Sequence, residues 1–237
     1  MFPEGVYGRA MPIAADRVPE RLPRGRHGLP RRFIVHNQRE RMLLAVAEAV
    51  AEQGFATTTV ADIIARARLS RRTFYEHFAD KEECFLAAYD TVVEQLLSAV
   101  GQAYEQAEGW TQKVHDGLET FLAYLAAEPA FARMCIVEVV AAGPEARSRR
   151  DAAMRVFVDF LEPGRAAAPK GIRVSEIAAE IVVGGIYEII YARLQRNAAN
   201  ELVEMLPELL YCALVPYIGH AEGEQAVAAA RERAGAT

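Results

Sequence analysis

The chain has 237 residues, enough for one large domain or two small ones, and a formal net charge of −5. No apolar run approaches the roughly 18 residues that span a bilayer, and its three cysteines are too widely spaced for a disulfide framework or a zinc site. We therefore expect a cytoplasmic protein without a membrane partner, with Cys84, Cys135 and Cys212 as buried free thiols. Residues 1–82 hold 14 Lys and Arg against 10 Asp and Glu, whereas the remainder is acidic, so the first part is the one suited to a polyanion.

Residues 1–37 predict a flexible arm. Pro and Gly recur in this segment without a helical period, which is typical of an extended or disordered chain. The arm is either a solvated linker or a basic segment that follows a nucleic-acid backbone or enters the adjacent minor groove. Its candidate contact residues are Arg24, Arg26, Arg31 and Arg32.

Short helices are predicted next, beginning with residues 38–53. Apolar side chains recur there at helical spacing, and Gly54 is suited to end the helix in a left-handed conformation. A second helix over residues 60–67 follows Thr58 and Thr59, either of which can accept a hydrogen bond from the backbone of the first turn. Asp62 lies three residues after Thr59, so the pair is predicted to form a capping box.

The second helix is predicted to turn sharply into a third. The chain leaves the helical pattern at Arg68, and the Ser70 hydroxyl can cap the next helix. Two helices joined by so short a turn form a helix-turn-helix unit, whose second helix enters the DNA major groove with its first turn facing the bases. We expect residues 71–73 to face base edges, and Tyr75 and Lys81 to contact phosphates. The full set of DNA-binding candidates is Thr59, Ser70, Arg71, Arg72, Thr73, Tyr75, His77 and Lys81.

These residues carry a family resemblance. A helix ending in Gly-Phe, followed by TTTVADIIARARLSRRTFYEHFADKEE, resembles the N-terminal domain of the TetR/AcrR family of bacterial transcription regulators. The resemblance runs from about Arg39 to Tyr89. One departure is Arg68, because the family usually has glycine in this turn; the residue either keeps a negative φ or accepts a mild strain. The resemblance implies a DNA-binding domain over residues 38–82 and a helical effector-binding and dimerisation domain over residues 83–220.

The second part of the chain is helical throughout, and no strand pattern competes, so the predicted fold class is all-α. A C-terminal tail is expected over residues 221–237, and Pro207 and Pro216 predict a bend in the last helix before it. The predicted helices span about 81–106, 111–127, 130–141, 144–161, 174–196 and 200–219.

Two adjacent glycines interrupt the helix over residues 174–196. Each costs about 1 kcal/mol relative to alanine, and the close approach of another helix would offset that cost. By the family resemblance this other helix belongs to a second subunit, which implies a homodimer; close packing within one chain is the alternative. The expected dimer contacts are Ile181, Gly184, Gly185 and Glu188.

The resemblance also implies a pocket for a small-molecule effector among the middle helices. Its candidate lining is aromatic and sulfur-rich, which suits an apolar or aromatic ligand, although each such residue could equally belong to the ordinary core. Glu138 is costly to bury unpaired, so it meets a cationic ligand, meets Arg133 or Arg155, or faces solvent. The pocket candidates are Trp110, Phe121, Tyr124, Phe131, Met134, Glu138, Phe157 and Tyr187.

The sequence gives little support to an enzyme. It contains no G-x-S-x-G elbow and no G-x-G-x-x-G loop after a strand. His115 and Glu119 share a helix face but have no evident third ligand, so no metal or cofactor is predicted. The prediction is a homodimeric, ligand-responsive regulator, most simply a repressor that leaves a palindromic double-stranded DNA operator when its effector binds. The alternative is a helical adaptor or small-molecule-binding protein without sequence-specific DNA binding, which leaves the basic third helix unexplained.

Overall fold

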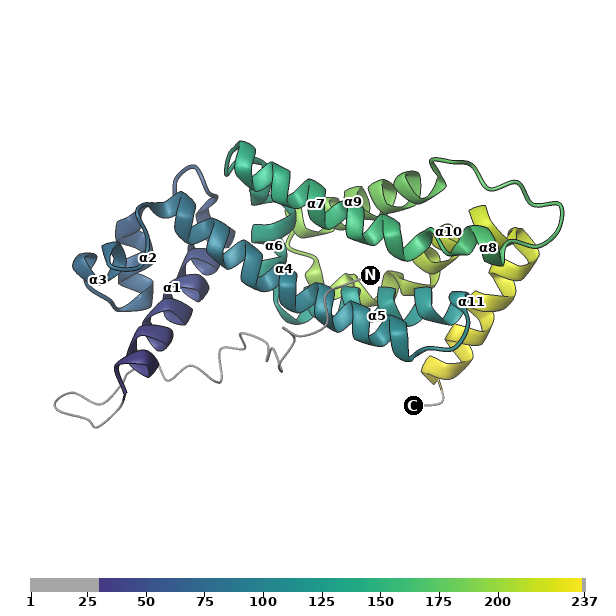
Figure 1. Cartoon of the computed structure of the whole chain (residues 1–237), viewed down its shortest axis with the longest axis horizontal. Helices are drawn as coiled ribbons and strands as arrows, with labels where there is room; N and C mark the ends of the chain where they lie inside the picture. Colours follow the sequence, from purple (N-terminus) through teal and green to yellow (C-terminus); the bar gives the residue numbers. More distant parts are fainter. Residues whose placement is uncertain (1–29, 236–237) are drawn as a thin grey trace.

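The computed structural model describes residues 30–235, which form α- and 3₁₀-helices and contain no strand. The predicted all-α fold is therefore confirmed. Figure 1 shows α1–α3 as a small domain at one end, with α4 running from it into a larger helical domain. The helices are α1 (Arg31–Gln53), α2 (Val60–Ala67), α3 (Arg71–Tyr75), α4 (Lys81–Gln106), α5 (Trp110–Ala127), α6 (Pro129–Ile136), η1 (Glu138–Val140), α7 (Pro144–Leu161), α8 (Gly164–Ala167), α9 (Ala178–Gln195), η2 (Ala199–Glu201), η3 (Val203–Met205), α10 (Leu206–Ile218) and α11 (His220–Gly235).

The core of the small domain continues into the larger one. Phe74 of α3 is fully buried against apolar residues of α1 and α2, including Met42 and Ile63. Phe131 and Met134 of α6 belong to the same cluster of buried side chains. Helix α6 is thus a structural part of both domains, and a movement of α6 must change its packing against α1.

Helix α1 begins earlier than predicted. It starts at Arg31, so residues 31–37, expected to be part of an extended arm, are helical. Pro30 precedes the first turn, where a fixed φ costs nothing and no backbone donor is lost from the helix. Arg31 and Arg32 consequently lie exposed in the first turn of α1, whereas Arg24 and Arg26 lie outside the described residues.

Several helix ends in the larger domain also differ from the sequence prediction. The helix expected over 130–141 ends at Ile136 and continues as the separate turn η1. The last expected helix begins as η2 and η3, because Pro207 stands in the first turn of α10, where proline is tolerated. Pro216 lies inside α10.

The predicted tail over residues 221–237 is wrong for most of its length, since α11 occupies residues 220–235. Gly219 ends α10 at φ +86° and lets the chain turn back. A Cβ on Gly223 would lie 2.9 Å from Val215, so this glycine permits α11 to approach α10 closely. The inner side of α11 buries Val227 and Ala230 against that helix.

Two of the three cysteines are buried as predicted. Burial raises the pKa of the Cys84 thiol to about 12, and it raises the pKa of the Cys135 thiol as well. Cys212 is exposed, which corrects the prediction for that residue; it lies on the outer side of α10, although its neighbours in sequence are apolar. Among the described helices, none combines the length and apolarity needed to cross a membrane.

Candidate functional site

The start of α2 has the predicted capping geometry. The Asp62 carboxylate accepts the Thr59 N–H at 2.8 Å, and the Thr59 hydroxyl accepts the Asp62 N–H at 3.3 Å. The Thr59 hydroxyl also donates to the Asp62 carboxylate at 2.6 Å, and this bond, with the one from the Thr59 N–H, lowers the pKa of Asp62 because both favour its ionised form. The capping box is confirmed, and it fixes the direction in which α2 leaves the preceding loop.

The turn between α2 and α3 places Arg68 in a left-handed conformation, with φ +51° and ψ +45°. The alternative of a negative φ is therefore wrong, and the residue carries the mild cost that glycine would avoid. Arg41 of α1 braces this turn, since its guanidinium donates to the carbonyls of Ala67 and Arg68. A contact 27 residues away in sequence thus supports the strained turn.

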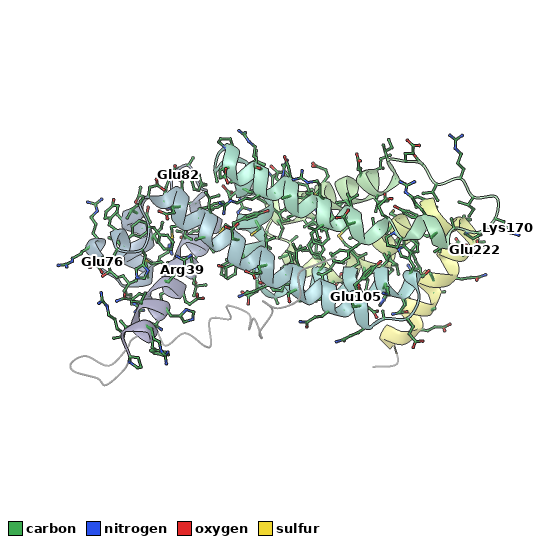
Figure 2. All side chains as sticks on the ribbon, viewed as in Figure 1. Arg39, Glu76, Glu82, Glu105, Lys170 and Glu222 are labelled. Atoms are coloured by element: carbon green, nitrogen blue, oxygen red, sulfur yellow. The ribbon has the colours of Figure 1, made fainter. Side chains whose placement is uncertain are left out.

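Helix α3 presents a basic and hydroxylic face to solvent. Ser70 caps the helix by accepting the Thr73 N–H at 3.0 Å, as predicted. Arg71 and Arg72 are exposed, the Arg72 side chain to 90%, and Tyr75 is 51% exposed. Arg72 pairs with Glu76 at 3.0 Å, and Figure 2 shows Glu76 at the outer end of the small domain. This surface can donate hydrogen bonds to a polyanion without rearranging the core.

His77 is not the outward residue that was predicted. Its ring is half-buried, and Nε2 lies 3.4 Å from the Gln38 side-chain oxygen on α1. Burial, assisted by the charge of Arg39, lowers the pKa of His77 below its ordinary value. Near neutral pH the ring is therefore a neutral group that packs between α3 and α1. Helix α3 ends at Tyr75, so it is too short to carry residue 77 onto its solvent-facing side.

Lys81 also differs from expectation. Its Nζ donates to the carbonyls of Phe55 and Thr58, each at 2.9 Å, and lies 4.5 Å from the centre of the Phe55 ring. The side chain thus folds inward from the first turn of α4 and secures the loop between α1 and α2. This engagement removes the reason for treating Lys81 as a free phosphate ligand.

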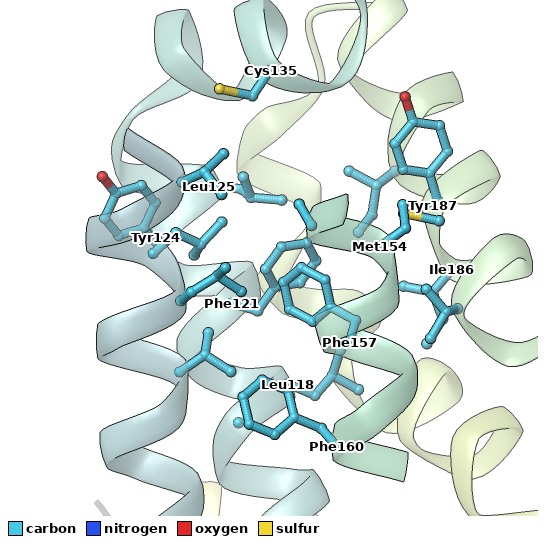
Figure 3. Close-up of a pocket in the computed structure, with 18 of the residues that line it drawn as sticks. Leu118, Phe121, Tyr124, Leu125, Cys135, Met154, Phe157, Phe160, Ile186 and Tyr187 are labelled. Atoms are coloured by element: carbon cyan, nitrogen blue, oxygen red, sulfur yellow. The ribbon is translucent and has the colours of Figure 1, made fainter. Parts of the chain in front are cut away.

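A large apolar cavity lies within the second domain, with about 1140 Å³ of space between atoms, part of it open to solvent. Figure 3 shows Phe121 and Tyr124 of α5 and Phe157 and Phe160 of α7 around this space, with the Phe121 and Phe157 rings packed together at 4.9 Å between their centres. The wall also includes residues of α4, α6 and α9. Lys113 and Arg150 are the charged residues in the lining, and each stacks on a tyrosine ring.

Five of the predicted pocket residues line the cavity: Phe121, Tyr124, Phe131, Phe157 and Tyr187. Trp110, Met134 and Glu138 do not, which corrects those predictions. Trp110 packs on Tyr217 with ring centres 4.9 Å apart, at a second, more polar hollow near α11. Met134 is fully buried in the core shared with α1, and Glu138 lies beside the small domain.

Several aliphatic and sulfur-containing residues of the wall were not among the predicted ones. Helical spacing from Phe121 gives Leu118 and Leu125 on the same side of α5, and spacing from Phe157 gives Met154 on α7. Ile186 carries no comparable signal, because its facing partners lie on helices remote in sequence. Figure 3 places Met154 and Ile186 beside Tyr187 and Phe157.

Helix α9 exposes an apolar face. Ile181 is 62% exposed and Ile177 is 53% exposed, and Glu188 lies on the same exposed side. A Cβ added to Gly184 or Gly185 would meet no atom of residues 30–235 within 4 Å. Close packing among these residues therefore does not explain the two glycines.

The two potential metal ligands His115 and Glu119 on α5 have a third potential ligand, Asp116, beside them. Asp116 lies with His115 and Glu119 so that one ligand atom from each falls within 4.8 Å of the others. His115 Nδ1 lies 2.7 Å from Asp116 Oδ1, to which Gln112 also donates at 2.5 Å. Asp116 Oδ1 thus already has hydrogen-bond partners on its own helix.

The small domain is a capped helix-turn-helix with an exposed basic helix, and it is joined to a helical domain with an apolar cavity. This combination is typical of DNA-binding regulators. The family model for bacterial regulatory proteins of the tetR family matches residues 43–88. The transcriptional activator FasR of Mycolicibacterium smegmatis is 28% identical over 111 residues, 47% of this chain and 51% of FasR. The regulator EthR of the same organism is 28% identical over 153 residues, 61% of this chain and 70% of EthR.

The fold has counterparts among solved structures. The regulator FadR of Bacillus subtilis, solved in complex with stearoyl-CoA, superposes with a TM-score of 0.64 at 17% identity and covers 76% of this chain and 97% of its own. The match to FasR spans about half of that relative. Residues 43–88 therefore match the tetR family of bacterial regulatory proteins, and both curated relatives are transcriptional regulators.

Proposed function

We propose that the protein is a homodimeric repressor that binds a palindromic operator and releases it when an elongated apolar effector enters the cavity. The observation that carries this proposal is the cavity itself, whose wall shares α6 with the core of the DNA-binding domain. A ligand in this space contacts the helix that packs on α1. The required coupling between the two sites is about 1–3 kcal/mol.

The shape of the cavity supports the choice of effector. Along α4 the wall extends from Tyr89 to Tyr104, which corresponds to about 22 Å at 1.5 Å per residue. The lining is almost entirely apolar, so a ligand with many buried polar groups would leave them unpaired. FadR of Bacillus subtilis was solved with stearoyl-CoA, and its fold supports a long acyl chain as the kind of ligand to test first.

The exposed face of α9 supports the dimer. Isoleucines and the two glycines give a flat apolar surface on which an identical helix can pack closely. Two α3 helices would then lie about 34–36 Å apart and meet successive major grooves of a symmetric site. Arg71 and Arg72, with Thr73, would face the bases, and Tyr75 a phosphate.

Fluorescence anisotropy with DNA from upstream of the coding region tests the proposal. We expect salt-dependent binding that stearoyl-CoA reverses, with the apolar chain rather than the CoA group determining affinity. Arg71→Ala should relax base preference at one position in each half-site, worth about 1–3 kcal/mol of discrimination. Binding of acyl compounds without any binding to selected DNA would instead favour a small-molecule-binding protein.

The direction of control needs a separate measurement, since FasR is a transcriptional activator. Transcription in vitro from the upstream promoter should fall when the protein is added and recover with the effector. A rise on addition of the protein would refute the repressor assignment and leave the DNA-binding proposal standing.

A further inference from the structure

The boundary between the two domains contains a nearly buried carboxylate. Glu138 lies in η1, directly after α6, with its side chain 14% exposed. Its Oε2 accepts the backbone N–H of Phe55 at 3.0 Å, in the loop that joins α1 to α2. A Cβ on Gly54 would lie 3.4 Å from the same oxygen, so glycine leaves room for this approach. A side chain of the effector domain thus holds the backbone of the DNA-binding domain.

The other oxygen of this carboxylate faces Arg133 of α6. Arg133 Nη2 lies 3.8 Å from Glu138 Oε1, and its Nη1 donates to the carbonyl of Leu194 at 2.9 Å. Leu194 lies in the last turn of α9, the helix that carries the exposed apolar face. Polar contacts therefore connect the end of α9 with the loop before α2, and they pass through one arginine and one glutamate.

The loop at Phe55 is also held from the side of α4. Lys81 binds the Phe55 carbonyl, while the Phe55 ring packs on Phe85 with centres 5.0 Å apart. The N–H of this residue is thus tied to η1, and its carbonyl is tied to the first turn of α4. A shift of η1 relative to α4 must break one of these contacts or rotate the loop that positions α2.

The same helix α6 forms part of the cavity wall. Phe131, Cys135 and Ile136 line the cavity. Tyr187 of α9 lines it too, and its hydroxyl donates to the Ile136 carbonyl at 2.7 Å. An occupant of the cavity would press on both Tyr187 and the last turn of α6, two residues before Glu138.

We propose that Glu138 is a positioning residue that transmits occupancy of the cavity to the DNA-binding domain through the Phe55 N–H. The carboxylate is needed rather than any acceptor, because Arg133 anchors it to α6 and α9. The inference rests on the proposed function where it concerns the operator, but the mechanical link can be tested without DNA.

Amide hydrogen exchange at Phe55 gives that test, followed in the intact chain by mass spectrometry or NMR. Loss of a charged acceptor should speed exchange of this amide about tenfold or more in Glu138→Ala, with a smaller change in Glu138→Gln. Glu128→Ala is the control, because Glu128 stands at the opposite end of α6. Unchanged exchange in Glu138→Ala overturns the proposal. Arg133→Met is the second variant if Glu138→Ala fails to fold.

Filling the cavity without a ligand tests transmission. Ala153 of α7 lines the cavity, and Ala153→Trp should speed Phe55 exchange several-fold and weaken operator binding; Ala153→Leu is the milder version. In the Glu138→Ala background the same substitution should add little, as expected for coupled sites. Equal effects in both backgrounds, or no effect on Phe55 in the otherwise unchanged chain, overturn the proposal. Absence of DNA binding by the unchanged protein would refute the proposed function and leave the exchange result to decide the link between the two domains.

Discussion

The small N-terminal domain and the larger helical domain are built on different ranges of contact. In the small domain the decisive hydrogen bonds join residues three apart, such as Thr59 to Asp62 and Ser70 to Thr73. The cavity wall instead combines residues of six helices, from Tyr89 of α4 to Ala213 of α10. The first domain is specified by local chemistry and a dense core, whereas the second leaves space that its helices do not fill.

A matched pair of aromatic truncations tests this contrast most strongly. Phe74→Ala removes a fully buried ring and should cost about 3–5 kcal/mol of unfolding free energy. Phe157→Ala removes a ring that already borders empty space, so we expect a smaller loss together with altered binding of stearoyl-CoA. Urea denaturation measures both, and equal losses would contradict the contrast.

Lys81 should matter to stability and not to DNA affinity. Lys81→Met keeps most of the aliphatic length but removes the donor to the Phe55 and Thr58 carbonyls, and should cost about 1.5–3 kcal/mol. The salt dependence of operator binding should stay as in the unchanged protein. Arg71→Ala is the reverse case, with a change within about 0.5 kcal/mol in stability and a shallower salt dependence. A shallower salt dependence for Lys81→Met would return this residue to the DNA interface.

Dimerisation should depend on the glycines of α9. Gly185→Leu would hold a partner helix away at a cost of about 1–3 kcal/mol and shift the protein towards monomer at micromolar concentration. Gly101→Leu in α4 is the matched control, because a Cβ there also meets nothing within 4 Å. Analytical ultracentrifugation distinguishes them; a Gly185→Leu variant that stays dimeric would move the interface to another face.

The smallest effect concerns pH. Because burial and Arg39 lower the pKa of His77, the unfolded chain takes up this proton more readily than the folded one. The contribution of His77 to stability is thus complete above about pH 6.5 and is lost as the pH falls towards the lowered folded value. Urea midpoints between pH 5 and 8 should decline less on acidification in His77→Gln. An identical decline in both proteins would place the titrating group elsewhere.

The departures from prediction in the small domain involve long side chains. The positions of Arg71, Arg72 and Tyr75 followed from helical spacing and a short turn. Lys81 and His77 were assigned to DNA by their chemistry, yet both fold back onto neighbouring segments, Lys81 onto the loop at Phe55 and His77 onto α1. A flexible or polarisable side chain has several partners within reach. The partner it contacts depends on which backbone carbonyls and rings the tertiary structure places nearby.

The sequence by itself determined the helical class and the capped helix-turn-helix, because capping and periodicity act within a few residues along the chain. Tertiary structure decided which aromatic residues face the cavity, why Trp110 and Met134 do not, and where α11 packs. It also decided the environment of Glu138, whose partner Phe55 lies 83 residues away in sequence and whose other partner, Arg133, binds the Leu194 carbonyl 61 residues further along the chain. Such contacts depend on how helices α1, α6 and α9 are placed against one another, and no local pattern encodes that placement.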